Sequence, residues 1–111
     1  MRRFGGKRSG QLRRGDSDDV LHLREFAASR PGVEAFVEPP TAVTTTTVVF
    51  VAGSGEWTRR RIADAAAAHS LANALGVPSY DAAVVGYPQR MRDWNARAKI
   101  EDQRRRTAPE L

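Results

Sequence analysis

The chain has 111 residues, of which 41% are hydrophobic, with 18 Lys and Arg against 13 Asp and Glu and no cysteine. This length indicates one domain, and the lack of cysteine excludes a disulfide framework, a cysteine-ligated zinc site and thiol catalysis. No apolar run reaches the roughly 20 residues that span a bilayer, and no apolar stretch follows the basic N-terminus as in a secretory signal. We therefore expect a cytoplasmic protein without membrane contact.

The net charge of +5 is divided unevenly along the chain. Residues 1–14 carry six bases and no acid, residues 15–89 carry five bases and nine acids, and residues 90–111 carry seven bases and four acids. Basic ends on a mildly acidic body are typical of proteins that bind polyanions, because each neutralised phosphate releases counterions. The alternative is that the ends serve solubility or pair with the acidic body.

The first 15 residues are expected to form a disordered basic arm, because glycines separate the bases and only Phe4 and Leu12 are large and apolar. The segment Asp16-Ser17-Asp18-Asp19 then predicts the start of a helix, since short polar side chains accept hydrogen bonds from free first-turn N–H groups. Apolar residues recur at helical spacing up to Pro31-Gly32, where we expect the helix to end.

Three strands are predicted next. Val33–Glu38 alternates between two faces and stops at Pro39-Pro40, because proline cannot donate to a ladder. Val43–Ala52 is rich in β-branched residues, and Glu56–Ile62 returns after the turn Gly53-Ser54-Gly55. The last two segments therefore predict an antiparallel hairpin.

The second half of the chain is predicted to hold a helix, a short strand and a helical tail. Ala63–Leu75 has an Ala-rich face, with Asp64 at its start and Gly76 as a left-handed cap. Tyr80–Gly86 contains a short apolar run that favours a fourth strand. Gln89–Arg106 carries acid-before-base pairs at i, i+4 spacing, which are typical of an exposed helix.

The element order α-β-β-β-α-β predicts an α+β fold, in which a small antiparallel sheet carries two helices on one face. We expect a single domain over residues 16–88, preceded by the arm of residues 1–15 and followed by a basic, partly helical tail of residues 89–111. An edge strand leaves backbone groups unpaired, so pairing of two copies through a strand edge is open.

Two clusters combine tryptophan with arginine. In the first, Trp57, Arg59 and Arg61 share one face of the predicted third strand. An exposed Trp beside guanidinium groups can stack a base and hold phosphates. The alternative is a Trp at the edge of the core, with the Arg stems covering apolar surface and their charged ends paired to glutamates across the sheet.

The second cluster lies in Tyr87–Trp94 and contains Arg90, Arg92 and Trp94. These residue types are enriched at binding hot spots, and a tail docked on its own sheet uses the same types. All the Trp and Arg residues of both clusters are candidate binding residues.

Residues that could carry catalysis are sparse. The two histidines, His22 and His69, lie on predicted helices without a second metal ligand at suitable spacing. Ser54 lacks the Gly-x-Ser-x-Gly surroundings of a nucleophile elbow, and Gly53-Ser54-Gly55 lacks the third glycine and the following helix of a dinucleotide fingerprint. We therefore expect no catalytic residue, no metal and no cofactor, and the residues favour a non-enzymatic protein over an enzyme.

The first five predicted elements resemble the α-β-β-β-α order of the double-stranded RNA-binding domain, and the Ala-rich helix is similar to its closing helix. The chain departs from that family at the RNA contacts. Ile62-Ala63-Asp64-Ala65 stands where the family has a lysine cluster, and Pro39-Pro40-Thr41-Ala42 stands where its loop has a Gly-Pro-x-His type motif. No RNA contact is therefore carried over.

A second resemblance covers more of the chain. Gly32–Pro39, Gly55–Arg61 and Val85–Arg92 are similar to segments of short uncharacterised proteins of high-GC actinobacteria, which are sometimes labelled oxidoreductases. The resemblance implies no known site, because no residue here marks a cofactor pocket.

Three functions remain open from the sequence. The first is a non-enzymatic binding module whose basic arms and Trp/Arg strand face engage nucleic acid, a ribonucleoprotein or an acidic protein surface. The second is an accessory subunit that docks on a partner protein through Met91, Trp94 and Ile100 of the tail. The third is an enzyme of unrecognised type, including the oxidoreductase label.

Overall fold

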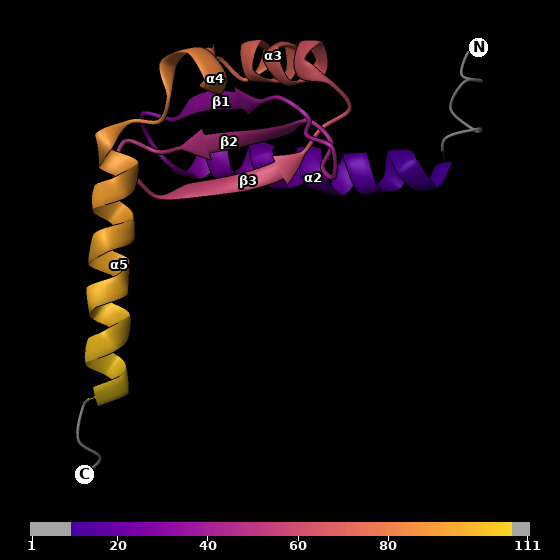
Figure 1. Cartoon of the computed structure of the whole chain (residues 1–111). Helices are drawn as coiled ribbons and strands as arrows, with labels where there is room; N and C mark the ends of the chain where they lie inside the picture. The colour runs from indigo at the N-terminus through magenta and orange to yellow at the C-terminus, as the bar shows by residue number, and fades with distance from the viewer. Residues whose placement is uncertain (1–9, 108–111) are drawn as a thin grey trace.

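A four-stranded sheet organises the described part of the chain, which in this computed structural model is residues 10–107. The elements in chain order are α2 (Gly10–Ser29), β1 (Glu34–Glu38), β2 (Thr47–Val51), β3 (Trp57–Arg61), α3 (Ala65–Ala74), β4 (Ser79–Asp81), α4 (Ala82–Val85) and α5 (Gln89–Thr107). The strands lie in the order β3-β2-β1-β4, and Figure 1 shows β3 along one edge. The predicted α+β fold is confirmed.

The sheet is mixed rather than wholly antiparallel. Strand β2 pairs antiparallel with β1 and with β3, as the predicted hairpin requires. Strand β4 pairs parallel with β1, with Phe36 opposite Tyr80. The parallel pair arises because α3 carries the chain from β3 to the far edge of the sheet, and such a crossover returns the next strand in the original direction.

The larger core lies between one face of the sheet and the two helices α2 and α3. Leu23 and Phe26 of α2 and Ala72 of α3 pack against Val48 and Phe50 of β2 in this core. The alanines of α3 leave little side-chain bulk, so this helix can lie close to the sheet. Asp64 caps α3 as predicted, since its Oδ1 accepts from the Ala67 N–H at 2.8 Å.

The opposite face of the sheet carries a smaller apolar cluster. Phe36, Val49 and Val51 point to this face from the two central strands, and Ala82 of α4 and Met91 of α5 cover them. Both faces of β1 and β2 are therefore buried, although the second face is covered only by α4 and the start of α5. The Trp/Arg cluster of β3 lies on this second face.

Helix α2 begins earlier than predicted. Its first residue is Gly10, so residues 10–15, which the sequence assigns to the arm, belong to this helix in the structure. Once the amphipathic part is held against the sheet, adding residues to its end costs little, because each one gains a backbone hydrogen bond. The rest of the predicted arm, residues 1–9, lies outside the described residues.

The predicted fourth strand is also wrong beyond Asp81. Ala82–Val85 forms the short helix α4, and only Ser79–Asp81 is β-strand. The Asp81 carboxylate accepts from the Ala83 N–H at 3.2 Å, which starts the helix, and Gly86 at φ 72° ends it.

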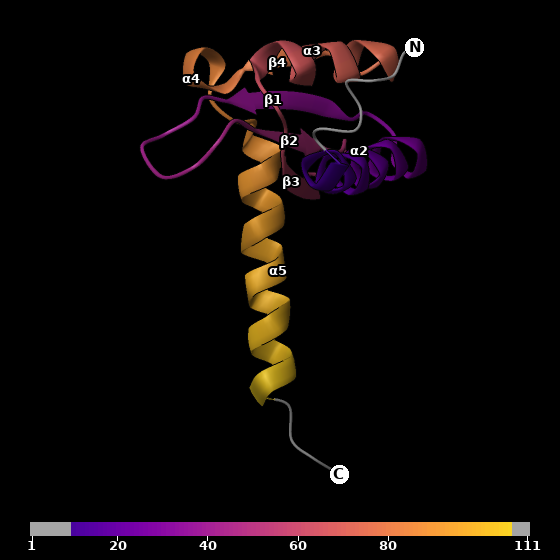
Figure 2. The ribbon, with the colours of Figure 1, turned by 90° about the vertical axis from the view of Figure 1, so that its right-hand side faces the viewer.

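Helix α5 leaves the domain and extends away from it, as the two views in Figures 1 and 2 show. Its bounds, Gln89–Thr107, closely match the predicted helical tail. Met91 is its buried side chain, and from Ala96 to Thr107 every residue except Asp102 is exposed. The helix is therefore anchored at one end only.

Candidate functional site

The turn between β2 and β3 lies directly against the first turns of α5. Gly55 in this turn has φ +97°, and a Cβ atom built on it would lie 2.1 Å from the Arg90 carbonyl oxygen and 3.0 Å from the Trp94 Cβ. No other residue type fits this contact without moving the helix. The glycine therefore sets how closely α5 approaches the sheet.

Arg90 fastens the start of α5 to the sheet. Its Nε donates to the Ala52 carbonyl oxygen at 2.9 Å, and its guanidinium pairs with the Glu34 carboxylate at 2.6 Å. The same carboxylate accepts from the Tyr80 hydroxyl at 3.2 Å. Arg90 was a candidate binding residue, and its side chain is engaged by its own domain.

Further polar contacts continue along α5 for two turns. The Trp57 indole N–H donates to the Asn95 Oδ1 at 2.7 Å, and Arg97 donates to the Ser54 carbonyl oxygen at 3.2 Å. The Arg97 guanidinium carbon also lies 5.8 Å from the centre of the Trp94 ring. The structure thus brings together the two Trp/Arg clusters, which the sequence analysis treated separately.

Arg59 belongs to a network centred on the Glu38 carboxylate. Arg59 donates to both carboxylate oxygens, at 2.9 and 3.1 Å, Thr47 donates at 2.5 Å, and the Tyr87 hydroxyl also donates. Burial alone would raise the pKa of Glu38, but these hydrogen bonds outweigh it, so the pKa is lowered. The Arg59 guanidinium carbon also lies 5.2 Å from the centre of the Trp57 ring. The ion pair between Arg59 and Glu38 follows the interpretation in which arginine pairs with glutamate across the sheet.

The remaining candidate arginines are more accessible. Arg60, which is not one of the candidates, points to the other face of the sheet and pairs with Asp19 at 3.5 Å. Arg61 ends the edge strand with its side chain exposed. Arg92 is exposed on α5 and donates to the amide oxygen of Gln89 at 2.7 Å. Arg61 and Arg92 are therefore the two candidates with free positive charge.

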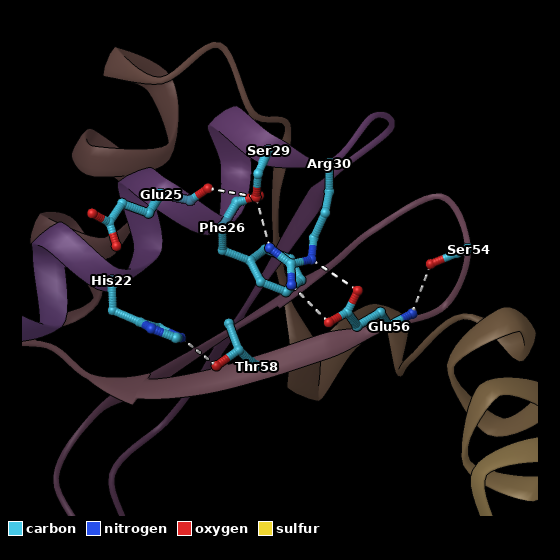
Figure 3. A network of polar contacts seen from close by, with 8 residues as sticks. All are labelled: His22, Glu25, Phe26, Ser29, Arg30, Ser54, Glu56 and Thr58. Atoms are coloured by element: carbon cyan, nitrogen blue, oxygen red, sulfur yellow. Dashed lines mark hydrogen bonds and ion pairs between the residues drawn. The ribbon is translucent and has the colours of Figure 1, made fainter. Parts of the chain in front are cut away.

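A contact that the sequence analysis did not predict ties the end of α2 to the start of β3 (Figure 3). Arg30 donates to both carboxylate oxygens of Glu56 at 2.8 Å, and its guanidinium carbon lies 4.3 Å above the Phe26 ring. The hydrogen bonds from Arg30 lower the pKa of Glu56. The Glu56 N–H in turn donates to the Ser54 Oγ at 3.2 Å. These contacts fix the same turn that receives α5.

Each histidine is hydrogen-bonded to a hydroxyl group. His22 Nε2 lies 2.7 Å from the Thr58 Oγ1, and His69 Nδ1 lies 2.7 Å from the Ser79 Oγ. Burial, followed by the charge of Arg60, lowers the pKa of His22. A hydroxyl nucleophile needs its base oriented by a third group, and among the described residues neither ring nitrogen has a carboxylate partner. Both pairs connect a helix to a strand.

The described residues offer little for a cofactor or a metal ion. An open hollow of about 450 Å³ lies where α2 and α3 end, lined partly by Arg30, Glu34 and Leu75. Among the side chains that the structure describes, no group of three metal-ligating residues gathers, and none of the described helices could cross a membrane.

Comparison of the chain with family models, with curated proteins and with solved structures finds no match. The resemblances to the double-stranded RNA-binding domain and to short actinobacterial proteins therefore remain predictions.

Proposed function

We propose that this protein is a non-enzymatic module that binds nucleic acid, with α5 as its principal contact. The observation that carries the proposal is the combination of charge and exposure in this helix. Helix α5 contains seven bases and three acids, and its free segment, defined here as Ala98–Thr107, extends clear of the domain (Figure 1). Apart from Ala98 and Ile100 the free segment is polar, so it buries no apolar stripe and leaves its charges open to a partner.

The pairing of charges favours α5 over the strand face as the contact. The arginines with carboxylate partners in the domain are Arg30, Arg59 and Arg60, together with Arg90 at the start of α5. By contrast, none of the described carboxylates lies within 4.0 Å of four bases of α5, namely Arg92, Arg97, Lys99 and Arg104. Unpaired cations displace counterions from a phosphate backbone and so supply affinity.

The accessory-subunit hypothesis is weakened by the same geometry. Met91 is 8% exposed because it packs on the sheet, and Trp94 is half-buried beside Gly55. Of the three apolar side chains on which that hypothesis depends, Ile100 is left in the free segment, with 48% of its surface exposed. A partner protein that recognises an apolar helix face would find a single anchor there.

Fluorescence anisotropy of a labelled nucleic acid tests the proposal. We expect the affinity of the full chain to fall steeply between 50 and 200 mM salt. The variant Lys99→Gln/Arg104→Gln removes two free cations, so the slope of log affinity against log salt should flatten by about 1.8.

The control variant Arg24→Gln/Arg61→Gln removes the same charge from two exposed positions of the domain. It should change the slope by less than the α5 variant does. Negligible binding at both salt concentrations would refute the proposed function, and equal effects of the two variants would refute the role of α5.

A further inference from the structure

We infer that α5 binds in the major groove of double-stranded DNA and faces the base edges with a neutral stripe, which consists of Ala96, Ile100, Gln103 and Thr107. The inference rests on the proposed function and specifies its partner.

The members of the neutral stripe are spaced four, three and four residues apart, so they follow one face of a helix that turns about 100° per residue. All of them are exposed. A glutamine amide can pair with adenine in the major groove, and small or apolar side chains contact the thymine methyl group. The stripe therefore has the residue types that read base edges, and it has no charge.

Two rows of cations flank the neutral stripe. Arg92, Lys99 and Arg106 recur every seven residues along one side, and Arg97 and Arg104 do so along the other. At about 100° per residue, Lys99 and Arg97 lie roughly 160° apart around the helix axis. A helix about 10–12 Å across fits the groove, which is about 12 Å wide and has a phosphate backbone along each wall. The two rows would therefore face the two walls, and Arg97 would give up its hydrogen bond to the Ser54 carbonyl oxygen to reach a phosphate.

The acidic and anchoring side chains lie on the opposite side of the helix. Met91 and Trp94 hold α5 to the domain and face away from the neutral stripe, and Asn95 holds it on the side of the Lys99 row. Glu101 and Asp102 share that side, where they would be turned away from phosphate. The domain therefore does not obstruct an approach of the neutral stripe to DNA.

Two carboxylates, those of Asp102 and Asp93, form contacts nearer to the cation rows. Asp102 pairs with Arg106 at 3.0 Å, but the Arg106 side chain is 76% exposed, and such a pair contributes little to stability and exchanges readily. Asp93 borders the neutral stripe in the first turn of α5 and accepts from the Gln89 amide at 3.0 Å. It lies at the end nearest the domain, about 10 Å along the axis from Ile100.

The shape of the groove distinguishes DNA from RNA as the partner. The major groove of an RNA duplex is deep and narrow, and side chains do not read it, whereas that of a DNA duplex admits a helix. We expect the full chain to bind a mixed-sequence DNA duplex of about 20 base pairs at least tenfold more tightly than the RNA duplex of the same sequence.

Fluorescence anisotropy with the DNA duplex, the RNA duplex and a single DNA strand separates the possible outcomes. Equal affinity for the two duplexes, or a preference for the single strand, would overturn the inference and leave the proposed function standing. Negligible binding to all of them would overturn both, and would direct attention to an acidic protein surface instead.

Ala96 and Ala98 provide a matched pair of variants. Both are exposed alanines of α5, two positions apart and therefore on nearly opposite sides of the helix. Ala96→Glu would place a carboxylate in the neutral stripe between the phosphate walls, and we expect it to weaken duplex DNA binding by about tenfold or more. Ala98→Glu makes the same chemical change on the side away from the groove, and it should weaken binding by less than about threefold.

Circular dichroism of both variants checks that the helix content is unchanged. Equal losses of affinity in the two variants would overturn the inference, because a helix that lies in a groove is sensitive to the side on which the charge is placed.

Discussion

At Gly55 the backbone of the β2–β3 turn passes so close to α5 that a single added methyl group would overlap the Arg90 carbonyl. Glycine is needed here for two reasons. A side chain would overlap the helix, and the φ of +97° belongs to the region that glycine alone adopts readily. Gly76 also has a positive φ, +71°, but an added Cβ there would have no atom within 4 Å, so the steric contact is missing. The two glycines therefore separate steric contact from backbone strain.

We expect Gly55→Ala to destabilise the protein by clearly more than Gly76→Ala. The strained conformation alone costs about 1–2 kcal/mol, and this cost applies to both variants. The overlap with Arg90 adds to it only at Gly55, because the helix has to move to relieve the contact. Urea unfolding followed by tryptophan fluorescence measures both free energies, and equal losses would show that the contact with α5 contributes nothing.

Glu38 makes stability depend on pH. Its pKa in the folded protein is lowered below the ordinary value of 4.5, because the hydrogen bonds from Arg59, Thr47 and Tyr87 outweigh the effect of burial. A lowered folded-state pKa means that the unfolded chain binds a proton more readily. The stabilisation is therefore complete above the unfolded pKa and is lost as the pH falls through the folded pKa.

The variant Glu38→Gln should flatten the acid side of the stability profile. Between about pH 6 and pH 3, the free energy of unfolding should fall less steeply in the variant than in the native chain, because one linked proton is removed. Urea titrations at a series of pH values measure this slope. In an Arg59→Gln background the same substitution should have a smaller effect, and identical effects in the two backgrounds would contradict the proposed coupling.

At the level of secondary-structure elements, local sequence signals predicted a helix or a strand wherever they clearly favoured one of the two. The hairpin of β2 and β3 was predictable from its glycine turn, and α3 was predictable from the cap at Asp64 and the glycine that follows it. The run Ala82–Val85 was not predictable, because four apolar residues fit a strand or a helix equally well. Contacts of Ala82 with the second face of the sheet, together with the Asp81 cap, decide in favour of the helix.

The candidate site was only partly predictable, because local sequence signals do not reveal contacts between residues far apart in the chain. Alternation along β3 correctly placed Trp57, Arg59 and Arg61 on one face. The contact of Trp57 with Asn95, which is 38 residues away, has no local signature, and neither does the contact of Arg90 with Glu34, which is 56 residues away. The seven-residue recurrence of bases in α5 was visible in the sequence, and it gained meaning once the anchored side of the helix was known.

The whole molecule is elongated because α5 is fixed only at its start. The principal extents are 62 × 34 × 32 Å, and the radius of gyration is 16.8 Å. A compact domain of this length would have a radius of gyration of about 13 Å. The charge is divided between the same two parts of the molecule, because the acidic body of the chain is largely separate from the basic helix.

Small-angle X-ray scattering should therefore give a radius of gyration near 17 Å for the isolated protein. Deleting residues 98–111 should lower it towards the compact value, while the urea midpoint changes little, because α5 beyond Arg97 has no hydrogen bond or ion pair to the sheet within the described residues. A value near 13 Å for the full chain would mean that the helix folds back on the domain.

The position of β3 at the edge of the sheet matters when several copies of the protein lie close together. Its outer edge carries backbone groups that could pair with a second copy, but Arg59, Arg60 and Arg61 follow one another along it. If two such edges met antiparallel about Arg59, six guanidinium groups would gather along five residue pairs, with the two Arg59 side chains directly opposed, and the carboxylates of Glu38 and Asp19 in each copy would offset part of their charge. Like charges facing each other across a ladder repel. Copies concentrated side by side on a polyanion would thus resist joining into a continuous sheet and would remain separate particles.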